Sequence, residues 1–167
     1  MPKKQEKYRL QPLLDVRIRN KRNAEIELGK AFKALKEEQE KLKKLEEEKQ
    51  EIIQKRENAR REMAEMLRMG ESVVSDSHGH LNFIKRLKED EEKKDQEIED
   101  QKFQIEKAED RVSKAKRDYI DACKEVKIME KHKELWKKKL KQKLEYEEQK
   151  LMNELGNVGH QLRKMRG

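Results

Sequence analysis

Residues 98–112 read Ile98-Glu-Asp-Gln-Lys-Phe-Gln-Ile105-Glu-Lys-Ala108-Glu-Asp-Arg-Val112, in which Ile98, Ile105, Ala108 and Val112 are separated by seven, three and four positions. Such steps place apolar residues along one stripe of a helix that packs against another helix. The pattern extends in both directions: eleven of the sixteen stripe positions from Leu14 to Met66 are apolar, and thirteen of the seventeen from Ile84 to Leu140. Because only 32% of the chain is hydrophobic, the stripe predicts two long coiled-coil helices.

The composition argues against a compact enzyme domain. Of the 167 residues, 48% are charged and 4% are aromatic, whereas an average soluble domain has about 25% charged residues. Too little apolar surface is left to enclose a dry active site, so we expect a single elongated coiled-coil domain. The sequence contains neither an apolar run long enough for a membrane span nor a secretory signal peptide, and its one cysteine, Cys123, suits a reducing cytoplasm.

Proline, glycine and serine mark the expected boundaries. Pro12 suits the first turn of a helix, and Gly70 suits the cap at the end of one. Serine, aspartate and glycine cluster between Gly70 and His80, which indicates a loop. The expected organisation is a basic segment over 1–11, a helix over 12–69, a loop over 70–80, a second helix over 81–155 and a C-terminal extension over 156–167.

Folding the chain back about this loop suggests how the helices pair. If the residue numbers of facing positions add to 150, every stripe position meets another stripe position. Leu35 then faces Ala115 and Leu28 faces Ala122. A large side chain opposite a small one fills the space between the helices without voids. A parallel homodimer would set leucine on leucine and alanine on alanine. The sequence therefore predicts an all-α fold: two long helices in a monomeric antiparallel coiled-coil hairpin with an overhanging C-terminal helical extension.

Three layers of this register are polar on both sides. They pair Arg56 with Lys94, Lys49 with Gln101, and Arg17 with Lys133. Facing cations cost stability unless the side chains reach outward to water. Since two of the three layers lie toward the loop, we expect that third of the hairpin to be its softest part.

Basic residues gather at the two ends of the chain. Residues 1–22 contain eight basic and two acidic residues, and residues 131–167 contain eleven and five, so each segment carries +6. A hairpin brings both segments to its open end, and a positive end favours an anionic partner. The lysines predicted to contact a partner there are Lys137, Lys138, Lys139 and Lys141.

The second helix outruns the first, because the position that would face Leu140 lies before Pro12. Beyond Leu140, apolar residues keep helical spacing with nothing in the chain to cover them. A solvated tail is the alternative, but an uncovered apolar stripe on so polar a protein usually marks a contact. This terminal stripe consists of Leu144 and the predicted partner-binding residues Leu151, Leu155, Val158, Leu162 and Met165.

The loop end offers a second predicted contact surface. Phe83 lies one position off the stripe, so its ring should be at least partly exposed. Val73 and Val74 are apolar residues in an otherwise polar loop. The alternative is a local apolar cap that closes the hairpin.

No motif for catalysis or cofactor binding stands out. The sequence has no glycine loop for phosphate, no Cys/His cluster at zinc spacing and no nucleophile–base pair. His78 and His80 with Asp76 could hold a metal, but we favour ordinary turn residues because a mobile loop lacks the closed shell of a structural site. Trp136 fits a packed stripe residue better than a stacking platform for nucleic acid. We expect no enzyme, no cofactor and no metal.

A basic chain of this length with two long helices, an unpaired C-terminal extension and no catalytic motif resembles the FliJ/YscO family. These are the central stalk proteins of type III secretion and flagellar export. The opening residues, Met1-Pro-Lys-Lys-Gln-Glu-Lys-Tyr8-Arg-Leu-Gln-Pro-Leu-Leu14, look like those of a chlamydial member. The resemblance covers the whole chain.

The family is similar to the central stalk of rotary ATPases. The resemblance implies that the terminal end sits in the ring of the export ATPase and that the loop end faces the membrane export gate. It also implies contacts with secretion chaperones. The expected protein is a non-enzymatic stalk or adaptor of bacterial virulence secretion, cytoplasmic and peripheral to the secretion apparatus at the inner membrane.

Two other classes stay open from the residues alone. A binder of nucleic acid or anionic surfaces fits the pI near 9.4, yet most basic residues alternate with glutamate in place of forming a contiguous basic face. A holdase chaperone would need several subunits joined by a base, and no strand-like segment is available to build one. Salt-dependent DNA binding would favour the first class, and a monomer in solution would remove the second.

Overall fold

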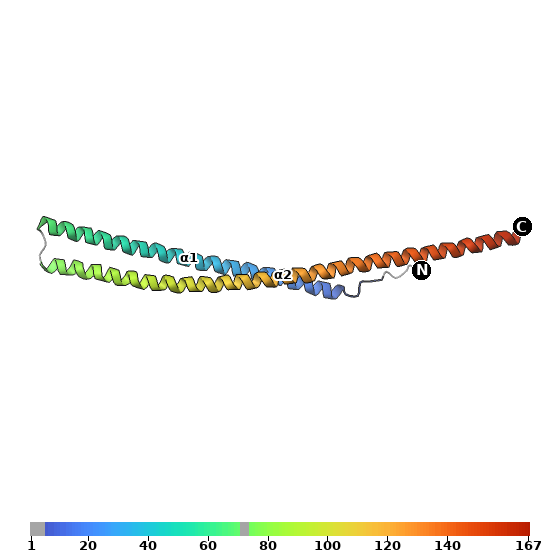
Figure 1. Cartoon of the computed structure of the whole chain (residues 1–167), viewed down its shortest axis with the longest axis horizontal. Helices are drawn as coiled ribbons and strands as arrows, with labels where there is room; N and C mark the ends of the chain where they lie inside the picture. The colour runs from blue at the N-terminus through green and yellow to red at the C-terminus, as the bar shows by residue number, and fades with distance from the viewer. Residues whose placement is uncertain (1–5, 71–73) are drawn as a thin grey trace. The chain divides into compact units, whose positions relative to one another are not determined.

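The computed structural model describes residues 6–70 and 74–167, with only the backbone described for 74–77. Helix α1 spans Gln11–Met69 and helix α2 spans Val74–Arg166 (Figure 1). Within these described ranges no strand occurs. The predicted all-α fold of two long helices is therefore confirmed.

Local chemistry sets the ends of α1. Pro12 occupies its first turn, where the missing N–H costs nothing. Just before it, the N–H of Gln11 donates to the carbonyl of Tyr8 at 3.2 Å, which turns the chain into the helix. Gly70 follows the last helical residue with φ of 72°, a left-handed conformation that ends helices and suits glycine.

The expected loop over 70–80 is wrong for residues 74–80, because α2 already begins at Val74. Serine and aspartate are favoured at the start of a helix as well as in loops, so the cluster at 75–77 marks the first turn of α2. Gly79 lies inside the helix at a propensity cost of about 1 kcal/mol. At the other end, α2 continues through the expected boundary at 156 as far as Arg166.

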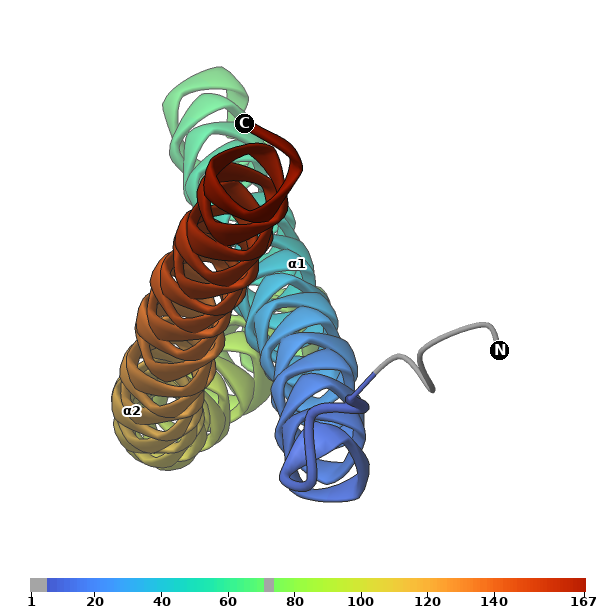
Figure 2. The ribbon, with the colours of Figure 1, turned by 90° about the vertical axis from the view of Figure 1, so that its right-hand side faces the viewer.

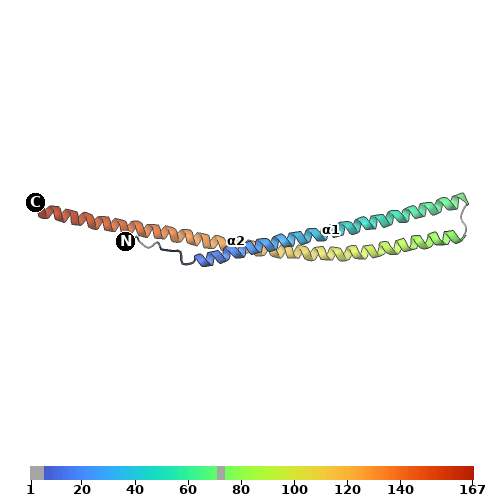
Figure 3. The same ribbon diagram turned by 180° about the vertical axis from the view of Figure 1, so that it is seen from behind.

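The chain forms two compact units. Unit 1 consists of Met1–Glu25 and Asp118–Gly167, and unit 2 consists of Ile26–Arg117. In unit 2 the two helices run antiparallel and lie side by side, as the views from both sides show (Figure 3). Ion pairs link the helices there, with Lys49 against Asp95 and Lys94 against Glu48.

The predicted stripe is the buried face of the helices. All seventeen stripe positions from Ile84 to Leu140 are buried or half-buried, as are fifteen of the sixteen from Leu14 to Met66. The exception is Met66, which is 40% exposed. The most buried apolar residues of unit 2 are Ala59, Leu87, Ile98 and Ala108. The heptad pattern therefore predicted which face of each helix packs.

The predicted register is wrong by about one heptad. The residue numbers of Lys49 and Asp95 add to 144 and those of Glu48 and Lys94 to 142, against the 150 expected. When the sum of facing residue numbers changes by seven, stripe positions still face stripe positions. The heptad pattern therefore fits both registers equally well. The early start of α2 explains the shift, because its first residue, 74, and the last residue of α1, 69, add to 143. This register places Leu35 opposite Ala108, not Ala115.

The new register breaks up the three predicted polar layers, although it sets Lys49 opposite Lys94, whose numbers add to 143. Arg56 pairs with Glu91, Lys49 Nζ lies 2.5 Å from Asp95 Oδ1, and Lys94 Nζ lies 2.8 Å from Glu48 Oε2. The hydrogen bond with Glu48 raises the pKa of Lys94. In unit 1, Arg17 Nη1 lies 2.7 Å from Glu125 Oε2. Each of these four cations meets a carboxylate, so the reason for expecting a soft third of the hairpin no longer holds.

The Arg56–Glu91 pair allows a stability test, since both side chains are only 18% exposed. We expect Glu91→Ala to lower the free energy of unfolding by about 1–2 kcal/mol, because it leaves the Arg56 charge half-buried without its partner. The double variant Arg56→Leu/Glu91→Leu should be at least as stable as the parent, because it removes both desolvation costs. Urea unfolding followed by circular dichroism measures both, and equal loss in the two variants would contradict this account.

Candidate partner-binding surface

The two basic segments meet in unit 1. Lys143 Nζ lies 3.4 Å from Glu6 Oε1, and the Tyr8 hydroxyl lies 2.7 Å from His132 Nδ1. Arg17 and Glu125 connect the helices further along. The first two contacts join residues 6–22 to residues 131–167, so the two basic segments lie within one unit.

Tyr8 is the anchor of the chain segment that precedes α1. Its side chain is 7% exposed, and its ring centroid lies 5.3 Å from that of Trp136. Trp136 is half-buried, which confirms the interpretation that it is a packed stripe residue. Around this contact lies a cavity of about 640 Å³, lined also by Glu6, Lys7 and Arg9.

Sequence analysis did not single out Tyr8, because it lies in the segment before Pro12 and outside the helical pattern. The only signal was an aromatic residue in a basic segment, four residues before Pro12. In a chain with so few aromatic residues, an aromatic side chain near a helix start is a good candidate for a tertiary contact.

The predicted lysine contacts are exposed on α2. Lys137, Lys138, Lys139 and Lys141 are all exposed. Lys141 Nζ lies 3.8 Å from Glu145 Oε1, four residues further along the same helix. Exposed ammonium groups of this kind mainly attract distant anions, because fixed surface pairs contribute little.

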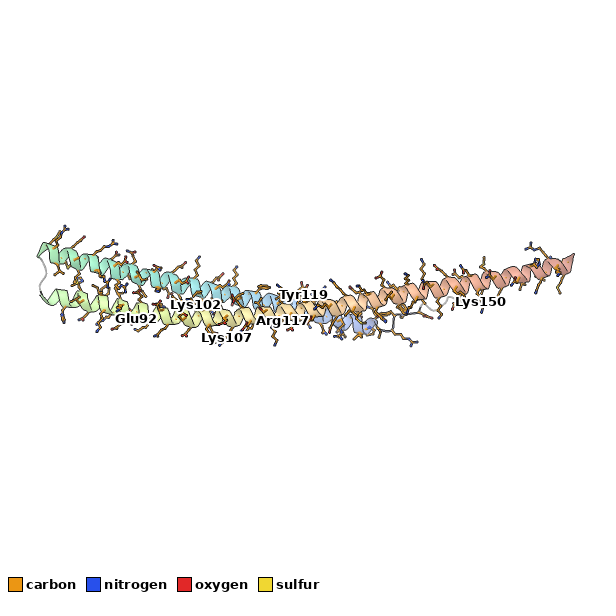
Figure 4. All side chains as sticks on the ribbon, in the orientation of Figure 1. Glu92, Lys102, Lys107, Arg117, Tyr119 and Lys150 are labelled. Atoms are coloured by element: carbon orange, nitrogen blue, oxygen red, sulfur yellow. The ribbon has the colours of Figure 1, made fainter. Side chains whose placement is uncertain are left out.

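The terminal stripe is exposed along its whole length. Every residue from Leu144 to Arg166 is exposed except Gly159, which is half-buried. Leu155 is 59% exposed and Met165 is 85% exposed. In Figure 4 the label Lys150 marks this part of α2, where side chains project on both sides of the helix. Figure 2 shows the same part as a continuous helix, which ends at Arg166. Unit 1 therefore presents apolar surface beside a lysine cluster.

At the other end of α2, Phe83 is 49% exposed, which confirms its expected partial exposure. Leu81, which the pattern did not single out, is also 49% exposed. Val74 is the first residue of α2, but its side chain is not described, and Val73 lies outside the described residues. Whether this end forms a contact surface or a local cap stays a prediction.

The candidate metal ligands His78 and His80 lie within α2, and the side chain of Asp76 lies outside the described residues. Groups of three or more metal-ligating side chains do not occur among residues 6–70 and 78–167, whose side chains are described. Cys123 is half-buried, and the hydrogen bond between its side chain and that of Tyr119 raises the pKa of Tyr119, so this phenol stays protonated at neutral pH. In the same part of the chain, neither helix is long and apolar enough to cross a membrane.

The fold and its exposed surfaces define an all-α hairpin protein with an apolar stripe and a basic cluster available to other proteins. The chain belongs to the YscO-like family, whose sequence profile matches residues 5–166. This family is associated with type III secretion, and its members are structural or adaptor proteins.

A solved structure supports the same fold. The chain is similar to a YscO homolog, CT670, from Chlamydia trachomatis, with a TM-score of 0.81 and 24% sequence identity. The match covers 97% of this chain and 99% of that one. The comparison with curated proteins gives no match.

Proposed function

We propose that the protein is a non-enzymatic stalk and adaptor of a type III secretion system, and that unit 1 binds the export ATPase ring. The single observation that carries this proposal is the exposed terminal stripe beside exposed lysines on α2. Membership of the YscO-like family supports the pathway. The end of α2 near Phe83 is proposed to contact the export gate or secretion chaperones.

The two kinds of surface have different roles in this proposal. The terminal stripe supplies apolar area that is lost from water on binding, and such burial holds a complex together. The lysines supply long-range attraction, which mainly raises the association rate. The ring is therefore expected to offer apolar surface flanked by carboxylates.

The mechanism needs no chemistry from this chain. A single helical protein in a six-fold ring touches its subunits unequally. It therefore binds their conformational states with unequal affinity, and a ligand of that kind shifts the populations of those states. The protein is proposed to alter ATP hydrolysis in this way. Its place in the cell is proposed to be the cytoplasmic side of the secretion apparatus at the inner membrane.

Reversing the lysine cluster tests the electrostatic part. We expect the change of Lys137, Lys138, Lys139 and Lys141 to Glu to slow association with the purified ATPase by about tenfold or more at low salt. The dissociation rate should change much less, because the terminal stripe is intact. Surface plasmon resonance at several salt concentrations separates the two rates.

A matched control reverses four basic residues of unit 2, Lys33, Lys43, Lys55 and Arg60, which are all exposed. This variant should associate nearly as fast as the parent. If both variants slow association equally, net charge alone matters and the lysine cluster has no specific role.

A further inference from the structure

We propose that residues 144–166 of α2 pair in antiparallel orientation with the same residues of a second copy of this chain. This inference goes beyond the proposed function and does not depend on it. It rests on the exposed terminal stripe, the charges around it and a groove beside it. The hairpin itself still forms within one chain, and the second copy contacts only this segment.

The spacing of the terminal stripe suits a second helix. From Leu151 the apolar residues follow at steps of four, three, four and three, ending at Met165. These are the steps of a two-stranded coiled coil. They are offset by one position from the stripe that packs within the hairpin, since Leu144, not Lys143, follows Leu140 in the apolar series. The segment therefore has a packing face of its own.

The antiparallel register that aligns these faces is self-complementary. It sets Leu151 against Leu162 of the second copy, and Leu155 against Val158. By the two-fold symmetry each pair occurs twice, which gives four consecutive apolar layers. The four side chains are 53–59% exposed in one chain, so all of them have area to lose.

Charge supports the same orientation. Acidic residues Glu145 and Glu148 lie at the start of the segment, and basic residues Arg163, Lys164 and Arg166 lie at its end. The antiparallel register brings Arg166 of one copy beside Glu145 of the other. Glu145 lies 3.8 Å from Lys141 of its own helix, but that pair is exposed and weak.

A shallow groove lies where the arginine would arrive. Its volume is about 560 Å³, and its lining includes Glu145, Glu148 and Met152. The carboxylates suit a guanidinium group, and Met152 suits its apolar stem. Across the interface, Met152 would lie opposite Gly159, where nothing is within 4 Å of the position of an added Cβ. The missing side chain leaves room for the methionine.

The parallel arrangement is less favourable. In a parallel pair, Glu148 would face its own copy in the apolar seam, and like charges there destabilise a coiled coil. Arg166 would also lie far from Glu145. The sequence of this segment therefore distinguishes the two orientations, and it favours the antiparallel one.

Pairing would cover the surface that the proposed function assigns to the ATPase. The dimer would then have to dissociate before the terminal stripe could bind the ATPase. The interface is short, so we expect a weak, reversible dimer with a Kd of about 10–100 μM. Such a dimer dissociates readily when a partner competes for the terminal stripe.

Sedimentation equilibrium of the full chain without any partner tests the proposal. The chain should dimerise as its concentration rises, and Leu155→Ser should weaken this by about thirtyfold or more, because the residue occurs twice in the interface. The control His160→Ser changes an exposed residue on the opposite face, outside the groove, and should leave the Kd unchanged. A chain that stays monomeric at every concentration, or a dimer indifferent to Leu155→Ser, overturns the proposal.

Charge reversal tests the orientation. Glu145→Arg and Arg166→Glu should each weaken self-association by roughly tenfold, because each creates two like-charge contacts. An equimolar mixture of the two variants should recover the parent Kd, since each arginine then meets a glutamate of the other chain. Single variants that dimerise as well as the parent overturn the antiparallel register. Because no ATPase is present, these results do not depend on whether the proposed function is correct.

Discussion

Deleting residues 151–167 is expected to abolish stable association of the chain with the export ATPase. The deletion removes five apolar side chains of the terminal stripe, each at least half exposed in the free chain. Burial of one such side chain contributes about 1.5–3 kcal/mol, so loss of most of them exceeds what the lysines can replace. Size-exclusion chromatography of the mixture measures complex formation directly.

A finer variant controls for the length of the helix. Leu155→Ser/Leu162→Ser should weaken binding by about a hundredfold or more, whereas Asn153→Ser/His160→Ser on the opposite face should have little effect. Both double variants introduce two serines. Changing leucine to serine also lowers helix propensity by a few tenths of a kcal/mol per site, which is far less than a hundredfold change in affinity requires. Equal binding by the two double variants would show that the terminal stripe is not the contact.

Replacing Ile98 with glycine is expected to destabilise unit 2 by about 3–5 kcal/mol. Ile98 is 7% exposed and is among the most buried residues of the hairpin. Loss of its side chain leaves a cavity, which lowers the free energy of unfolding by about 2–4 kcal/mol. Glycine inside a helix lowers it by about 1 kcal/mol more. Thermal unfolding followed by circular dichroism measures the loss.

Gln104→Gly serves as the matched control for backbone flexibility. Gln104 lies on the same helix but is exposed, so only the propensity cost of about 1 kcal/mol should appear. A similar loss in both variants would mean that the packed stripe contributes little. That outcome would contradict the description of unit 2 as a coiled coil held by its apolar layers.

Which residues pack was predictable from the sequence. In a two-helix protein each helix has one neighbour, so burial follows the heptad steps. Even polar stripe positions such as Lys49 and Gln101 are half-buried, as the pattern requires. Met66, close to the end of α1, is the exception.

The register was not predictable from the same pattern. Two alignments seven residues apart match stripe to stripe equally well, and the choice between them depends on where the chain turns. Serine, aspartate and glycine at 75–79 favoured a long loop, although the same residue types open a helix. The charges held part of the missing information, because in the shifted register Lys49 and Lys94 reach carboxylates of the facing helix, Asp95 and Glu48.

The candidate site was predictable in part. Exposure of Leu151, Leu155 and Met165 follows from the length of the second helix relative to the first. The anchoring of the N-terminal segment by Tyr8 does not follow from any periodic pattern, because it depends on one side chain reaching His132 and Trp136. A periodic analysis detects stripes, and it misses single contacts made outside a helix.

The central claim is that unit 1 binds the export ATPase and changes its activity. The most direct measurement is ATP hydrolysis by the purified ATPase, with and without the full-length chain, together with sedimentation of the mixture. The account predicts a complex and a changed turnover, both lost when residues 151–167 are deleted. If the chain neither binds the ATPase nor changes its turnover, and binds DNA in a salt-dependent way instead, the account is wrong.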